Sequence, residues 1–212
     1  MVKLLAILSF IALAALPFAS AQSIENATIE REEYAVYSAM IIDYVDEERG
    51  VMVIANPTVR RDEPLTVKTL EFYSTDLKTY ITAANAPVVA QETLDDFLRR
   101  NKSNRWLTPK FEIDRKYVLV DYREITRLAN DMDHPNLTPG QLMEEWKPFF
   151  KEYRESHGFI SLSRVGFNQQ MDQALVHVGW RCPSLCGHWS FLLLAKKDGV
   201  WKVVGESNRI VS

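Results

Sequence analysis

The sequence predicts an α+β fold in which N-terminal helices and scattered strands pack on a C-terminal antiparallel β-meander. Apolar residues at helical spacing recur through much of the chain before Phe159, whereas short apolar runs separated by turn residues follow it. With 47% of its 212 residues hydrophobic, the chain has enough apolar side chains for a core.

The first residues have the composition of an export signal. Lys3 precedes the apolar run 4–16, and the small residues Ala19 and Ala21 occupy the positions that a signal peptidase recognises. The run is shorter than the roughly 20 apolar residues that a transmembrane helix needs. We therefore expect residues 1–21 to be removed and the mature protein to be secreted or periplasmic, without a membrane span.

Residues 22–212 are predicted to form a single α+β domain, with a helical extension over residues 22–50 as the alternative organisation. Loss of Lys3 with the signal changes the formal net charge from −3 to −4. A mildly acidic surface does not favour nucleic acid as a partner. The partner is therefore expected to be of another class, such as a protein or a component of the cell envelope.

The first predicted helix runs from Thr28 to about Glu48. The acidic residues Glu30, Glu32 and Glu33 would lie in its first turns, where the helix dipole favours negative charge. Gly50 ends it. The segments 51–55 and 69–74 are strand candidates, and most of the region between residues 57 and 90 has no clear period.

Three further helices are predicted before the meander. The first covers residues 91–101, and the strand 116–121 leads into the second, with Asp121 and Glu124 spaced as a capping box. Thr138, Pro139 and Gln141 give the start signal of the third, which spans about 139–155. Its apolar stripe consists of Leu142, Trp146, Phe149, Phe150 and Tyr153.

The C-terminal meander is predicted from four apolar runs, 159–168, 173–180, 188–196 and 200–205. Asp198-Gly199 is a strong signal for a tight turn between the last two. If the second and third runs pair so that residue numbers sum to 368, both faces of this hairpin are apolar, which is typical of central, buried strands. We expect the helix at 139–155 to cover one face and N-terminal elements the other. The two faces comprise Ala174, Val176, Val178, Leu192 and Leu194 on one side, and Leu175, Phe191 and Leu193 on the other.

The same register places Cys182 opposite Cys186 across the tip 183–185. Opposed residues on antiparallel strands have Cα atoms about 4.5 to 5.5 Å apart, within the range of about 4.4 to 6.8 Å that a disulfide spans. We therefore expect a disulfide in an oxidising compartment. The alternatives are a metal site completed by His177 and His188, and a reactive dithiol. Alternation along the strands places the two histidines on opposite faces, which disfavours a shared metal ion.

Four elements of the C-terminal quarter occur in a fixed order, namely Ser-Arg-Val-Gly-Phe-Asn at 163–168, Ala-Leu-Val at 174–176, Cys-x-x-Leu-Cys-Gly at 182–187 and Gly-x-Trp-Lys-Val-Val at 199–204. Together they resemble the signature of a family of exported, mostly bacterial proteins of unknown function. Family members often have glycines after the tip, where this chain has His188 and Trp189. The resemblance implies export and a shared fold, and brings no activity, cofactor or substrate.

The sequence contains no nucleophile elbow, phosphate-binding glycine loop, metal-binding histidine pair or dinucleotide fingerprint. We therefore predict a non-catalytic exported module without catalytic, cofactor-binding or metal-binding residues and without a cofactor. The alternative is a secreted hydrolase whose site pairs His157 or His177 with a carboxylate; His177 is otherwise expected in the core. The candidate contact surface is the hairpin tip, with Arg181, Ser184, Leu185, His188 and Trp189.

Overall fold

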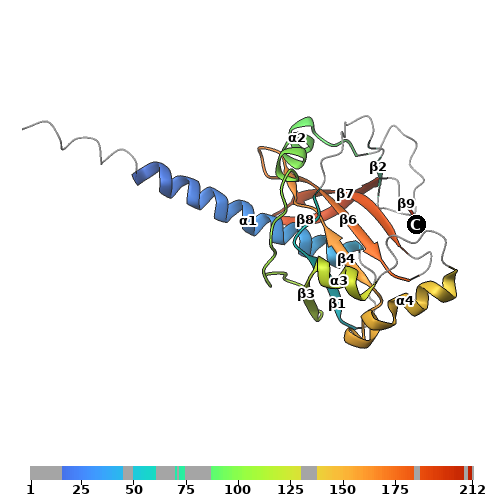
Figure 1. The fold of residues 1–212 in the computed structure, drawn as a ribbon. Helices are drawn as coiled ribbons and strands as arrows, with labels where there is room; N and C mark the ends of the chain where they lie inside the picture. The colour runs from blue at the N-terminus through green and yellow to red at the C-terminus, as the bar shows by residue number, and fades with distance from the viewer. Residues whose placement is uncertain are drawn as a thin grey trace, which may run out of the picture.

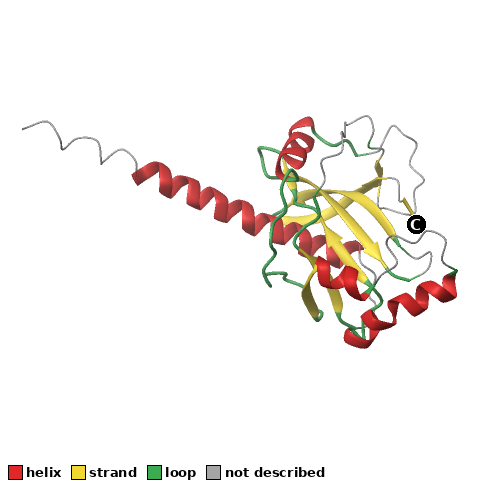
Figure 2. Ribbon diagram, viewed as in Figure 1, coloured by secondary structure: helices red, strands yellow, loops and turns green. Residues whose placement is uncertain are grey.

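The computed structural model describes residues 16–44, 50–60, 70, 72–74, 87–129, 138–183, 187–207 and 210–211. The described strands join one sheet with helices on both faces, which confirms the predicted α+β fold (Figures 1 and 2). The helices are α1 (Leu16–Tyr44), α2 (Gln91–Arg100), α3 (Tyr122–Leu128) and α4 (Pro139–Glu152). The strands are β1 (Met52–Asn56), β2 (Phe72–Ser74), β3 (Tyr117–Asp121), β4 (Phe159–Leu162), β5 (Gly166–Phe167), β6 (Gln173–Arg181), β7 (His188–Lys197), β8 (Val200–Ser207) and β9 (Ile210–Val211).

The strand order is β2-β8-β7-β6-β4-β1-β3, with β5 beside β6 and β9 beside β7. The C-terminal strands pair antiparallel, as expected for a meander. Strand β1 is different, because it lies parallel to both β3 and β4. The early strands therefore extend the C-terminal sheet instead of packing on it.

The pairing of β6 with β7 follows the predicted register from Gln173 opposite Ala195 to Trp180 opposite His188. The next hairpin turns through Asp198 and Gly199, whose φ angles of 52° and 81° suit a tight two-residue connection. The predicted strand 159–168 is wrong in one respect, since it divides into β4 and β5. Between them, the amide of Val165 donates to the carboxylate of Glu33 on α1. The backbone there leaves the strand ladder to meet the first helix.

Different helices pack on the two faces of the sheet. Helix α1 packs on the face that contains Val176 and Leu192, as expected for an N-terminal element. On the opposite face, α2 covers Leu175 and Leu193. Helix α4 was predicted to cover this central hairpin, and that prediction is wrong. Its aromatic side chains pack instead on β1 and β4, as shown by the cluster of Val53, Ala55, Trp146, Phe149 and Phe159.

Helix α1 begins at Leu16, earlier than the predicted start at Thr28. The added segment, residues 16–27, contains three alanines, one glutamine and one glutamate, all of which favour helix. Its first half projects from the body of the protein, and its buried residues begin at Glu33 (Figure 1). The acidic residues therefore lie well inside the helix, where each contacts basic side chains rather than the N-terminal dipole.

The predicted cleavage point after Ala21 falls within the described part of α1, whereas most of the apolar run 4–16 lies outside the described residues. Signal removal therefore stays a prediction. Among the described residues, none of the helices combines the length and the apolar character needed to cross a bilayer.

The capping box predicted for α4 is present, whereas the one predicted for α3 is not. Thr138 and Gln141 form the predicted capping box of α4. Asp121 caps α3 by accepting the amide of Arg123, but Glu124 does not complete a box. Its carboxylate binds the guanidinium of Arg127 one turn along the helix, and this ion pair replaces the predicted contact.

Candidate functional site

The hairpin tip carries the two cysteines. Cys182 is buried at the end of β6 and is not a free thiol. Its predicted partner, Cys186, lies outside the described residues, so the pairing stays a prediction. The confirmed register of β6 and β7 supports it, because continuing that register by two residues brings Cys182 opposite Cys186.

The predicted contact surface is described only in part. Ser184 and Leu185 lie outside the described residues, whereas Arg181, His188 and Trp189 are half-buried. The guanidinium of Arg181 lies 6.0 Å from the ring centroid of Trp189, in cation–π range. The tip therefore joins an arginine and a tryptophan from neighbouring strands.

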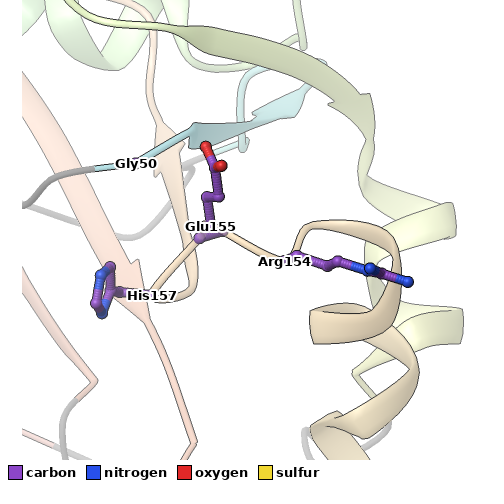
Figure 3. A pocket seen from close by; sticks show the side chains of 5 residues that line it. Gly50, Arg154, Glu155 and His157 are labelled. Atoms are coloured by element: carbon purple, nitrogen blue, oxygen red, sulfur yellow. The ribbon is translucent and has the colours of Figure 1, made fainter.

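The two histidines considered for a hydrolase are in different surroundings. His177 is 1% exposed and packs edge-to-face on Phe191, with ring centroids 4.9 Å apart, as expected for a core residue. His157 is exposed and lines a surface pocket of about 430 Å³ with Glu155 and Arg154. Figure 3 shows the side chains of Glu155 and His157 pointing in different directions. Glu155 therefore does not point toward His157 in the way that a carboxylate orienting a histidine base would.

Among the described residues, no group of three His, Cys, Asp or Glu side chains could hold a metal ion. The Cys/His metal site was one alternative to the disulfide, and one of its four residues, Cys186, lies outside those residues. The confirmed strand pairing places His177 opposite Phe191 and His188 opposite Trp180, in the alternation that separates the two imidazoles.

A different cluster is built around the carboxylate of Glu33, which is 1% exposed. The guanidinium groups of Arg100 and Arg105 each donate to Oε2 at 2.9 Å. Arg164 reaches both carboxylate oxygens, at 3.4 and 3.5 Å. Three arginines from separate parts of the chain therefore surround one buried carboxylate.

The acceptors of Glu33 are fully used. Besides the three arginines, its Oε1 lies 3.2 Å from the hydroxyl of Tyr37 and accepts the amide of Val165 at 3.1 Å. A carboxylate offers about four lone-pair sites, so these contacts saturate it. Burial, together with the negative charge of Glu33, holds the pKa of Tyr37 well above its ordinary value, and the phenol stays protonated.

The arginines, in contrast, have donors to spare. Three guanidinium groups carry about fifteen N–H bonds. Among the residues that the structure describes, these groups make five contacts within hydrogen-bonding distance, four to Glu33 and one to Glu30, which use a minority of the N–H bonds. The buried Nε of Arg100 has no hydrogen-bond partner among the described residues and lies 3.9 Å from a carboxylate oxygen of Asp96. In the described part of the chain, the acceptor sites of the Glu33 carboxylate are therefore all used, whereas the arginines have more N–H donors than their contacts use.

Burial and charge act in opposite directions on these arginines. Desolvation lowers the pKa of Arg100, and the negative charge of Glu33 counteracts it. Desolvation also works against the charge of Arg105, but Glu33 and Glu30 outweigh it and raise the pKa of that guanidinium. Arginine stays charged in proteins in either case, so the cluster keeps its positive groups across the physiological pH range.

Backbone contacts hold the arginines in place. The side-chain amide of Asn101 bonds the backbone of Arg164 on both sides, accepting its N–H and donating to its carbonyl. Thr58 exchanges two hydrogen bonds with the backbone of Arg105. Arg100 belongs to the last turn of α2, which packs so closely on Gly166 that a Cβ there would lie 2.4 Å from the Phe97 amide nitrogen.

Two adjoining hollows open beside this cluster where α1 leaves the body, and together we call them the arginine pocket. Both are lined by Asn26, Ile29, Arg100 and Arg164. The Arg99 hollow, of about 380 Å³, adds Glu25, Arg99 and Ser103. The Arg105 hollow, of about 460 Å³, adds Ser23, Ala27, Glu30 and Arg105.

Sequence analysis missed this site. Its arginines are scattered, and the contacts to Glu33 join residues 67, 72 and 131 positions apart. The only local signal was an acidic residue on the apolar side of α1, since Glu33 lies one turn before the core residue Tyr37. A charge at a core position of a helix indicates a buried partner.

Comparison of this chain with protein-family models, with curated proteins and with solved structures finds no match. The family resemblance of the C-terminal segment therefore stays a prediction.

Proposed function

We propose that this protein is an exported, non-catalytic module that binds an anionic group in the arginine pocket. The proposal includes removal of residues 1–21, a secreted or periplasmic location and a disulfide between Cys182 and Cys186. The partner carries an anionic group that can accept hydrogen bonds. It is a small molecule, a protein or a component of the cell envelope.

The observation that carries the proposal is the unequal use of donors and acceptors around Glu33. Its carboxylate is saturated, while the contacts within the described part of the chain leave N–H donors of the surrounding guanidinium groups unused beside two hollows. Phosphate, sulfate and carboxylate groups are the acceptors that arginine recognises best, because its planar fork matches their oxygen atoms. Water would satisfy the same donors, so an anion must displace water to bind.

Charge balance limits the expected affinity. Glu25 and Glu30 also line the hollows, and Asp96 contacts Arg99 and Arg100 behind them. The site therefore gains more from its directed donors than from its net charge. We expect weak binding of a simple ion, with a dissociation constant of millimolar order, and tighter binding of a ligand that also contacts the surrounding surface.

The test is a titration of the ¹⁵N-labelled protein with inorganic phosphate, followed by NMR at low ionic strength to limit screening. Saturable shifts should map to α1, the end of α2 and the segment around Arg164. The Arg164→Gln variant should bind phosphate at least tenfold more weakly, the effect expected from losing a charged hydrogen-bond donor. Arg164 is the best choice because its contacts to Glu33 are the longest of the three.

Arg123→Gln is the matched control. Its side chain is 84% exposed and pairs with Asp121, away from the arginine pocket. This variant should bind phosphate as the parent protein does. Equal affinity in the parent and in both variants would show an adventitious ion only and would overturn the proposal.

A further inference from the structure

We infer that the ligand of the arginine pocket carries two anionic groups, one for each hollow, an inference that rests on the function proposed above. Arg100, Arg164 and Asn26 line both hollows. Each hollow also has an arginine that the other lacks, Arg99 in one and Arg105 in the other. The two sets of donors therefore overlap in a shared pair of guanidinium groups, and each set adds one arginine of its own.

The two hollows have matching chemistry. Each is lined by three arginines and one glutamate, Glu25 in the Arg99 hollow and Glu30 in the Arg105 hollow. Each also contains a serine, Ser103 in the first and Ser23 in the second. Each hollow therefore presents arginine N–H donors and a serine to one anionic group, although Glu33 and Asp96 balance much of the charge of these arginines.

Helix geometry keeps the two anion positions apart. Ser23, Ala27 and Glu30 are spaced four and three residues apart and share one face of α1. Glu25, which lines only the Arg99 hollow, lies on another face of α1, and Asn26 and Ile29, which line both hollows, lie between these two faces. The residues that line only one hollow therefore lie on different faces of α1, and each hollow offers its own position for one anionic group. A ligand that bridges the two hollows must pass Asn26 and Ile29, which line both.

The experiment compares inorganic phosphate with butane-1,4-bisphosphonate, in which a short flexible chain joins two anionic groups. Both are titrated into the ¹⁵N-labelled protein under the same low-salt conditions. We expect two phosphate ions per chain but one bisphosphonate, bound at least tenfold more tightly than phosphate. The gain follows from the millimolar or higher effective concentration of the second, tethered group.

Two variants block the hollows separately and leave every arginine in place. Ala27→Asp adds a negative charge to the Arg105 hollow, and Ser103→Asp adds one to the Arg99 hollow; both positions are exposed. Each should remove one of the two phosphate sites and abolish the advantage of the bisphosphonate. Thr28→Asp and Asn104→Asp add the same charge at exposed neighbouring positions that line neither hollow, and should retain both sites.

The outcomes separate the inference from the function on which it rests. A single phosphate site, or a bisphosphonate that binds no more tightly than phosphate, would overturn the two-group ligand while leaving anion binding intact. Equal loss in the hollow-blocking variants and in their controls would also overturn it, since the effect would then be a general one of charge. Failure of the protein to bind phosphate at all would refute the proposed function itself.

Discussion

The carboxylate of Glu33 lies 2.9 Å from the guanidinium of Arg100, and both side chains are almost completely buried. A buried ion pair gives little net stability relative to an apolar pair, because both charges lose their water. Removing one partner is much more costly, since the other charge is left buried alone. The pair therefore fixes how α1 meets α2 and makes that junction sensitive to substitution.

Glu33→Ala should lower the free energy of unfolding by about 3–5 kcal/mol, because it leaves Arg100 buried without its closest carboxylate. The measurement is urea denaturation followed by circular dichroism. Glu30→Ala is the control on the same helix, since Glu30 is partly exposed and its loss should cost less than about 1 kcal/mol. Similar losses in both variants would contradict a special role for the buried pair.

Gly166→Ala should destabilise the protein by about 1–3 kcal/mol through overpacking. Its Cβ would lie within 2.5 Å of three Phe97 atoms, two of them backbone, so α2 must move and carry Arg100 with it. Phosphate affinity should fall as well. Gly140→Ala is the matched control, because nothing lies within 4 Å of a Cβ there and alanine favours helix by about 0.5–1 kcal/mol. A Gly166→Ala protein as stable as the Gly140→Ala protein would disprove the close contact.

The carboxyl group of Glu32 makes the stability of the fold depend on pH in the acid range. Burial alone would raise the pKa of its carboxyl, but hydrogen bonds from Lys196 and Trp201 outweigh it and lower the pKa below the ordinary 4.5. The group therefore stabilises the fold fully above about pH 4.5, and this contribution is lost as the pH falls through the folded-state value. Glu32→Gln should flatten the stability profile in this acid range. An unchanged slope in denaturation curves between pH 3 and 6 would contradict this assignment.

The hairpin tip should contain a disulfide. Thiol titration of the oxidised, denatured protein should therefore detect no free cysteine, and the Cys182→Ser/Cys186→Ser double variant should lose about 2 kcal/mol of stability, the chain-entropy value for so short a loop. Two titratable thiols accompanied by one equivalent of bound metal would establish the metal site instead.

Local signals in the sequence were sufficient for the elements that depend on a few neighbouring residues. The register of β6 and β7 followed from alternating apolar residues, and the Asp198-Gly199 turn and the Thr138 cap followed from residues that suit those conformations. Such features have their causes within a few positions of chain. The N-cap Asp121 was identified, but its expected partner Glu124 had a competing arginine one turn away.

Sequence alone thus determined the fold class, the central hairpin and an expected export signal. The tertiary structure decided which helix covers which face, placed β1 parallel between β3 and β4, and assembled the arginine pocket. The physical reason is the distance along the chain between the residues that interact. Secondary structure and turns follow from nearby residues, whereas the surroundings of Glu33 require contacts with residues up to 132 positions away, and these exist only once the sheet and its helices have packed.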